Sequence, residues 1–313
     1  MISLKSLFGG KKESEEQNNK KKFEILKYDG IRAQRMHKLA YAIKCFEEAI
    51  LIEEDMETMG LLASTYTLDN RLDDAHALLE RMTQKVPNEI EPLLSLASLC
   101  YMQEDYNCME KTCQQAIALN KENPLAHFLA AKAYLGNKND IMAIGMLTRA
   151  IVLKEDFTDA LILRAEVLWR MKQTKDAAED VQTLLRINPE DEAALLLKGE
   201  ILNATEKKEE AIECLKQVLE LNPFNEKAYL LESSILSEQK EYDKAIDMLN
   251  EAIDINPNFA KAYHERGRVK LLKGDKNGSI EDIKKAMELN PEEEAAIDGN
   301  YNNYDNLKKN VPF

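Results

Sequence analysis

The chain has 313 residues, of which 44% are hydrophobic, 31% are charged and only 6% are aromatic. So much hydrophobic sequence excludes a disordered chain, and so few aromatic residues argue against a large sheet-rich core. The formal net charge of −14 argues against general nucleic-acid binding, because an acidic surface repels phosphate backbones.

The N-terminal segment, residues 1–22, is rich in lysine and is expected to be flexible and basic. Its apolar residues stop at Phe8, too soon for the core of a signal peptide, and no later stretch approaches the roughly 18 apolar residues of a membrane span. Residues 1–12 could still form a helix with one apolar face followed by two lysines, which would touch an anionic membrane. We favour disorder, because a single short anchor binds a membrane weakly.

From residue 23 onward the sequence repeats with a period of 34 residues, the spacing between successive Asn-Pro dipeptides. These dipeptides end at Pro189, Pro223, Pro257 and Pro291, and Pro87 lies three periods before the first of them. With each of these prolines at position 32, the predicted units are 23–55, 56–89, 90–123, 124–157, 158–191, 192–225, 226–259 and 260–293.

Each unit predicts two short helices. Apolar or small residues recur at steps of three and four, as in residues 228–236 and 245–253. Positions 8 and 20 are small in nearly every unit, for example Gly199 and Ala211, so the two helices can approach closely. Asn-Pro predicts the end of the second helix, because the residue before a proline avoids the helical region. A new helix then starts at or shortly after the proline.

Three segments carry a recognisable motif: Leu62-Ala63-x2-Tyr66, Ala130-Ala131-x2-Tyr134 and Ala42-x3-Phe46-x2-Ala49. With these segments the chain resembles the tetratricopeptide repeat family over residues 23–293. The resemblance implies an all-α fold, a right-handed superhelix of stacked helix-turn-helix repeats. The third unit departs most, with Met109 and Cys113 at positions where small and large apolar residues are usual.

The C-terminal end, residues 294–313, follows the last unit. We expect a short capping helix over residues 292–298, where glutamates at the start suit the helix dipole. Gly299 would stop this helix, and an extended tail would follow it.

No catalytic constellation is visible in the sequence. It contains no motif that cradles phosphates, binds zinc in a protease or presents a catalytic serine. The four histidines fall at unrelated repeat positions, so we expect no metal site, no cofactor and no enzyme activity.

The five cysteines form no C-x-x-C pair, and we interpret them as buried core residues in a reducing, cytoplasmic compartment. A redox role is disfavoured, since no neighbouring cation would lower a thiol pKa.

Two pairs of opposite charge occupy the same positions, 7 and 23, of two units. They are Arg164 with Asp180 and Arg266 with Asp282. We predict an ion pair between the two helices of each unit, with a structural role.

The resemblance further implies that positions 2, 5, 9 and 12 of each first helix line a concave groove. The predicted peptide-binding residues are Tyr101, Phe128, Lys132, Asp159, Ile162, Glu166, Trp169, Glu200, Asn203, Lys227, His264 and Arg268. Trp169 is either a binding anchor or a packing residue, and both interpretations stay open. Lys27 keeps one position of the clamp with which some family members grip a peptide carboxylate. Ile31 replaces the clamp's next residue, so the clamp is absent.

The leading functional hypothesis is a noncatalytic module that binds a peptide or protein segment in the concave groove. The alternative is a structural scaffold that assembles a complex through its convex face or ends, close to a membrane if residues 1–12 bind one. Both hypotheses predict a protein partner and leave its identity and the oligomeric state open.

Overall fold

The computed structural model describes the backbone of residues 4–290 and the side chains of residues 16–290. Over that range the chain forms sixteen α-helices and no β-strand, which confirms the predicted all-α fold class. The first helices of the repeats are α1 (Leu4–Arg35), α3 (Met56–Leu68), α5 (Glu91–Met102), α7 (Pro124–Gly136), α9 (Thr158–Arg170), α11 (Glu192–Ala204), α13 (Glu226–Glu238) and α15 (Ala260–Lys273). The second helices are α2 (Leu39–Ile52), α4 (Leu72–Lys85), α6 (Tyr106–Leu119), α8 (Asp140–Leu153), α10 (Thr174–Ile187), α12 (Lys208–Leu221), α14 (Tyr242–Ile255) and α16 (Lys276–Leu289). One helical hairpin therefore corresponds to each sequence repeat, with α1 beginning before the first one.

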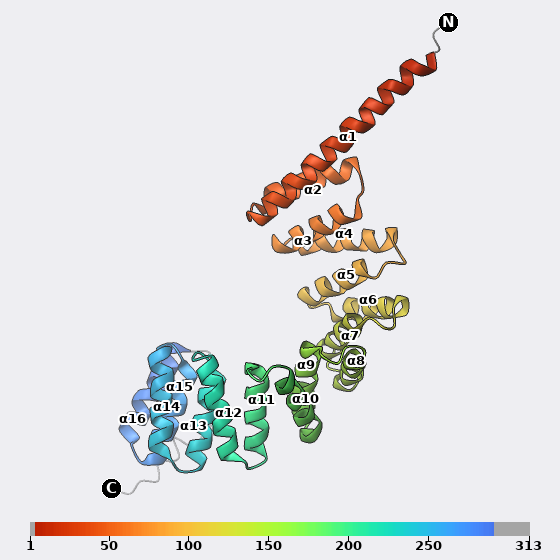
Figure 1. Ribbon diagram of the computed structural model, residues 1–313. Helices are drawn as coiled ribbons and strands as arrows, with labels where there is room; N and C mark the ends of the chain where they lie inside the picture. The colour runs from red at the N-terminus through yellow and green to blue at the C-terminus, as the bar shows by residue number, and fades with distance from the viewer. Residues whose placement is uncertain (1–3, 291–313) are drawn as a thin grey trace. The chain divides into compact units, whose positions relative to one another are not determined.

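The hairpins are grouped in two compact modules, an N-terminal module (Met1–Ala160) and a C-terminal module (Leu161–Phe313). In the N-terminal module each helix packs against the next one along the chain from α1 to α8 (Figure 1). In the C-terminal module the same packing runs from α10 to α16. Within each module, neighbouring hairpins thus bury their apolar faces against one another, as stacked repeats must.

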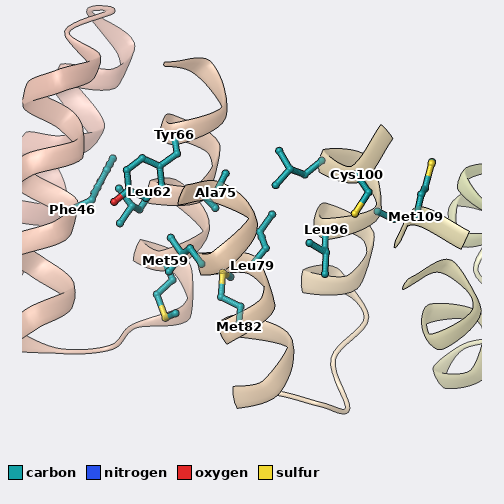
Figure 2. Close-up of a cluster of buried hydrophobic side chains, with 14 of the residues drawn as sticks. Phe46, Met59, Leu62, Tyr66, Ala75, Leu79, Met82, Leu96, Cys100 and Met109 are labelled. Atoms are coloured by element: carbon teal, nitrogen blue, oxygen red, sulfur yellow. The ribbon is translucent and has the colours of Figure 1, made fainter. Parts of the chain in front are cut away.

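The core of the N-terminal module lies between consecutive helices (Figure 2). Phe46, Met59 and Met109 are completely buried there. Phe46 crosses its hairpin to reach Gly30, where an added Cβ would lie only 2.6 Å from the ring. The small residue at position 8 is therefore required by the aromatic side chain opposite it.

The Asn-Pro dipeptides end the second helices, as predicted. Asn188, Asn222 and Asn256 are the C-terminal caps of α10, α12 and α14, in extended conformation. The Oδ1 atom of Asn222 accepts a hydrogen bond of 3.0 Å from the N–H of Phe224, and the other two asparagines bond in the same way. The asparagine thus closes a turn, and the proline that follows lies in the linker.

Position 15 of every repeat, in the turn between its two helices, adopts the left-handed conformation. Seven of these residues are not glycine and have φ between 56° and 63°: His37, Asn70, Glu104, Lys138, Lys172, Glu206 and Lys240. The eighth is Gly274, with φ of 100°. This shared conformation turns the chain back on itself within each hairpin.

The N-terminal segment differs from its prediction. Residues 4–22 are helical and continue into the first repeat, so α1 is one helix from Leu4 to Arg35 (Figure 1). The expectation of a flexible segment is wrong there, because lysine, glutamate and glutamine are good helix formers and the packed part of α1 supplies the nucleus. The side chains of residues 1–15 lie outside the described part, as do the predicted capping helix and tail after residue 290.

Candidate binding surfaces

An apolar hollow of about 670 Å³ opens between α3 and α5 in the N-terminal module. Its floor contains small residues at positions 5 and 9 of the first helices, namely Gly60, Ser64 and Ser98. Leu68 and Met102 flank them and are more than half exposed. The hollow exists because the positions that hold large side chains in other repeats hold small ones here.

Two of the four hydroxyl groups that line the hollow are bonded to their own helices. Ser98 Oγ donates to the Leu94 carbonyl at 2.9 Å, and Thr67 Oγ1 donates to the Ala63 carbonyl at 2.9 Å. Thr67 and Ser98 therefore offer a ligand mainly their hydrocarbon surface, and most of the other lining residues are apolar, so the hollow favours an apolar guest.

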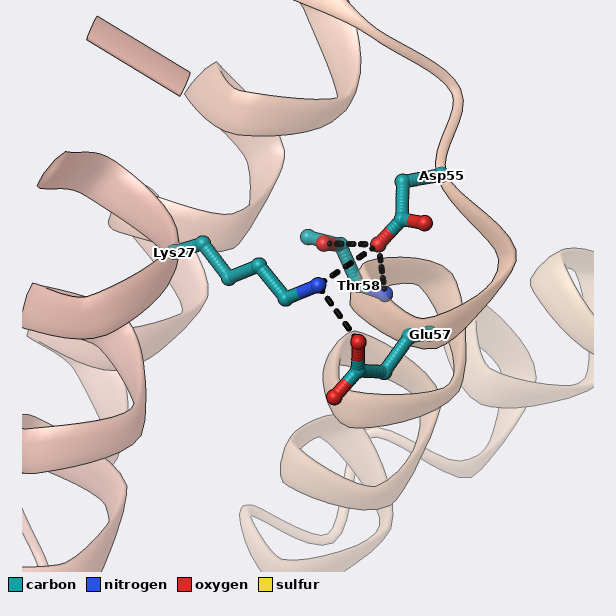
Figure 3. Close-up of polar contacts among 4 residues, drawn as sticks. All are labelled: Lys27, Asp55, Glu57 and Thr58. Atoms are coloured by element: carbon teal, nitrogen blue, oxygen red, sulfur yellow. Dashed lines mark hydrogen bonds and ion pairs between the residues drawn. The ribbon is translucent and has the colours of Figure 1, made fainter. Parts of the chain in front are cut away.

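Acidic residues gather where α3 and α5 begin. Glu57, Glu89 and Glu91 line that end of the hollow. Lys27, reaching from α1, bridges Glu57 Oε2 at 2.6 Å and Asp55 Oδ2 at 3.0 Å (Figure 3). One lysine thus offsets part of the negative charge, and the end of the hollow still suits a basic group.

Asp55 anchors this acidic end by capping α3. Its Oδ2 atom also accepts bonds from the N–H and the hydroxyl of Thr58, at 2.9 and 2.7 Å. Burial alone would raise the pKa of Asp55, but the bonds from Thr58 and Lys27 outweigh it and lower that pKa. Because the Lys27 ammonium group already pairs with Asp55 and Glu57, it is not available to bind a peptide carboxylate.

Three of the predicted groove residues gather on α5 and α7 as an aromatic cluster. The ammonium group of Lys132 lies 3.6 Å from the ring centroid of Tyr101 and 5.8 Å from that of Phe128. The Phe128 ring also contacts Phe157, with centroids 5.0 Å apart. Leu125, one turn before Phe128, lines the hollow, so the cluster and the hollow share α7.

The predicted residues of the C-terminal module include a charged group on α9, α11 and α13. Partial desolvation by surrounding helices raises the pKa of Glu166, Glu200 adds to that rise, and Lys227 opposes it. Trp169 is half-buried, with the Lys172 ammonium 5.8 Å from its ring centroid. Its intermediate burial fits both interpretations of the tryptophan.

The other predicted residues are less clearly grouped. Asp159 is exposed and Ile162 half-buried on α9, Asn203 is half-buried on α11, and His264 is half-buried on α15. Arg268 is held by Glu265, one turn earlier, through bonds of 2.5 to 3.0 Å. Glu265 therefore offsets part of the positive charge that Arg268 brings to the eighth repeat.

The structure brings together both predicted ion pairs. Arg164 meets Asp180 through two bonds of 2.8 and 2.6 Å, and Arg266 meets Asp282 with the same two distances. Arg266 also donates to Asn250 at 2.7 Å. Both carboxylates are buried, so these pairs connect the helices of their hairpins and are not free to bind a ligand.

Sequence reasoning missed the hollow, because it selected aromatic and charged residues. The available signal was the opposite one: glycine and serine at positions 5 and 9 of the second repeat, and serine at position 9 of the third. Within residues 4–290 no group of three histidine, cysteine or acidic residues is arranged to hold a metal ion. None of the described helices is long and apolar enough to cross a membrane.

Comparison with known proteins supports the repeat fold. The family model of the tetratricopeptide repeat protein 21 N-terminal ARM repeat matches residues 140–277, less than half of the chain. One chain of the APC/C hetero-tetramer Cut9–Hcn1 is similar, with a TM-score of 0.57 at 14% identity over 83% of this chain. This chain spans 51%, about half, of that chain's length.

The pilF protein of Pseudomonas aeruginosa is also similar, with a TM-score of 0.55 at 15% identity over 65% of this chain and 92% of that one. No curated protein sequence matches significantly. At such low identities the structural likeness establishes the fold alone.

Proposed function

We propose that this chain, a repeat protein of the tetratricopeptide type, binds a peptide or protein segment in the hollow between α3 and α5. Repeat proteins of this type generally serve as noncatalytic scaffolds for protein–protein interactions. The observation that carries the proposal is the hollow itself, about 670 Å³ of mainly apolar space within the range of known ligand sites.

The lining of the hollow suggests what the bound segment looks like. Aliphatic or aromatic side chains would occupy the floor over Gly60, Ser64 and Ser98, where they would displace water from apolar surface. A lysine or arginine of the segment would lie near Glu89 and Glu91. Such a segment could extend past Leu125 to the aromatic cluster, since Leu125 and the cluster residue Phe128 both lie on α7.

The test is to fill the hollow without disturbing the core. Ser64→Arg places a long side chain in the hollow from an exposed helical position. Ala118→Arg adds the same charge and a similar volume at an exposed position of α6, outside the hollow, and is the matched control. Arginine is a good helix former, so both variants should keep wild-type circular dichroism.

Peptides selected from a phage-displayed random library on the wild-type chain would be measured against all three proteins by fluorescence anisotropy. We expect Ser64→Arg to weaken their affinity at least about tenfold, or about 1.4 kcal/mol, and Ala118→Arg to leave it unchanged. Selected peptides should combine apolar residues with a basic one. A library that yields no binder, or peptides that bind Ser64→Arg as tightly as wild type, would contradict the proposal.

A second proposed role, a scaffold that assembles through its ends, draws on the length of α1. Residues 16–22 of α1 are exposed along a helix that leaves the packed array (Figure 1). A helix that projects in this way could contact a partner or a membrane surface without using the hollow. Deleting residues 1–22 separates this role from groove binding.

A further inference from the structure

Two cysteines of the third repeat lie close enough to bond. Cys100, on α5, and Cys108, on α6, face each other across the turn of one hairpin, with 2.7 Å between their Sγ atoms. A disulfide bond measures about 2.05 Å, so a shift of well under 1 Å would join them. We propose that Cys100 and Cys108 are a redox-responsive pair that forms a reversible disulfide across this hairpin.

The backbone holds both cysteines in place. The N–H of Asp105 donates to the Cys100 carbonyl at 2.9 Å, and the Asp105 side chain caps α6 by accepting from the Cys108 N–H at 2.9 Å. One residue in the turn therefore fixes the positions of both thiols.

The pairing follows from the repeat register. Cys100 and Cys108 hold positions 11 and 19, and the eighth repeat also places these two positions close together. In the eighth repeat an added Cβ on Gly278, at position 19, would lie 3.1 Å from the side chain of Lys270, at position 11. Only the third repeat places cysteine at both positions.

The two thiols differ in their access to solvent. Cys100 is completely buried, whereas Cys108 is half-exposed and lines a polar depression on the surface of α4 and α6. Burial, with a further contribution from neighbouring Cys108, raises the pKa of the Cys100 thiol. Cys108 is therefore the thiol that meets an oxidant, and Cys100 is the one that resolves the first product.

The chemistry is a thiol–disulfide exchange with a small-molecule disulfide such as oxidised glutathione. The Cys108 thiolate attacks one sulfur of that disulfide, forms a mixed disulfide and releases one thiolate. The Cys100 sulfur then attacks Cys108 Sγ, releases the second thiolate and transfers its proton to it. The two protein thiols lose two electrons and two protons, and the small disulfide becomes two thiols.

The bond would stabilise the hairpin that borders the proposed binding hollow. It closes a short loop, and such cross-links restrict the unfolded chain. The inference does not depend on the proposed binding function, because its test uses no ligand.

The experiment uses the full-length chain in glutathione buffers of increasing oxidised fraction, followed by acid quenching, alkylation of remaining thiols and trypsin digestion. A single tryptic peptide, residues 86–111, contains Cys100 and Cys108 and no other cysteine. We expect this peptide to lose about 2 Da, the mass of two hydrogens, and to escape alkylation in oxidising buffer. Dithiothreitol should reverse the change.

Thermal unfolding by circular dichroism supplies the second readout. Oxidation should raise the apparent Tm by about 5 °C in wild type and in the control Cys45→Ala, and leave Cys108→Ser unchanged. Cys108 is half-exposed, so its serine variant should fold, and the wild-type peptide map decides the question even if it does not. Two alkylated thiols in peptide 86–111 at every buffer ratio, or glutathione retained on Cys108, would overturn the proposal.

Discussion

Glu232 is a buried carboxylate that lacks the partner its position finds in other repeats. It holds position 7, where Arg164 and Arg266 meet aspartates at position 23, but position 23 of its own repeat is Met248. Its side chain is only 2% exposed, and its Oε2 atom makes no hydrogen bond within the described residues. Burial raises the pKa of Glu232 to about 7, with Lys216 opposing the rise and Glu251 adding to it.

This carboxylate makes stability depend on pH. The ordinary pKa of 4.5 applies in the unfolded chain, so between pH 4.5 and about 7 the folded chain keeps a proton that the unfolded chain has lost. Stability therefore falls as pH rises through that window, and the penalty is complete above it. Glu232→Gln removes the titration, and we expect the variant to be more stable than wild type at pH 8 by about 1 to 3 kcal/mol.

Urea unfolding followed by circular dichroism at pH 5, 6, 7 and 8 measures this effect. The difference between Glu232→Gln and wild type should grow with pH. Glu220→Gln, at an exposed position of α12, is the control and should show a constant difference. Stability curves that run parallel for Glu232→Gln and wild type would count against a buried, titrating Glu232.

At the residue scale, the sequence allowed contacts to be predicted where two repeat positions carry opposite charges. Arg164 and Asp180 could be matched because opposite charges at two repeat positions suggest each other. Glu232 has no such partner to reveal its burial. Cys100 and Cys108 each look like core residues, and only the hairpin geometry brings them together.

At the element scale the left-handed residue at position 15 decides how each hairpin turns. Gly274 is the one glycine among these positions, and its φ of 100° is strained for any side chain. We expect Gly274→Ala to destabilise the chain by about 1 to 2 kcal/mol for conformational reasons alone, since an added Cβ there meets nothing within 4 Å.

Gly145→Ala is the matched control for this substitution. Gly145 lies inside α8, and an added Cβ there also meets nothing within 4 Å. The control should stabilise the chain by about 0.5 to 1 kcal/mol, because glycine is unfavourable in a helix. Equilibrium urea unfolding gives both values, and changes of the same sign in the two variants would refute the conformational argument.

The helices could be predicted well because the repeat supplies the register. Small and apolar residues at fixed positions of each unit, with a proline in five of the eight, fix where the two helices lie, and eight copies average out local exceptions. The helical state of residues 4–22 could not be predicted in this way, since no repeat extends there. The left-handed turn also left no sequence signal, because lysine and glutamate occupy most of its copies.

At the scale of the whole molecule the packed array begins at Phe23. This residue is buried, whereas every residue from 16 to 22 is exposed. Deleting residues 1–22 should therefore leave the unfolding midpoint within about 1 °C of wild type, as expected for a change away from buried contacts. A deletion through Arg35 also removes the buried Phe23 and Ala33 and should lower the midpoint strongly.

Differential scanning calorimetry measures these midpoints. Co-sedimentation with anionic phosphatidylserine vesicles shows at the same time whether residues 1–22 bind membranes. If the shorter deletion lowered the midpoint by several degrees, the N-terminal end of α1 would belong to the folded array. If it abolished vesicle binding while peptide binding persisted, the scaffold role would gain support over groove binding alone.

The class of fold follows from periodicity, and the resemblance to a repeat family suggests a protein-interaction role, but neither gives the place of binding. Aromatic and charged residues at groove positions directed attention to repeats three to eight. The hollow lies over Gly60 and Ser64, where the side chains are absent or small. A small residue leaves a hollow only if the surrounding residues do not fill the space, and the sequence alone does not show how they are arranged.

The Arg–Asp pairs of the fifth and eighth repeats also bear on how a chain of look-alike hairpins assembles correctly. If α9 packed against α12 in place of α10, Arg164 would face Cys214 in place of Asp180. A half-buried guanidinium without its carboxylate still carries a desolvation cost, smaller than the roughly 3 to 5 kcal/mol of a fully buried pair. The two ion pairs thus disfavour misfolded states in which neighbouring repeats exchange helices. Repeat proteins are prone to this error during folding.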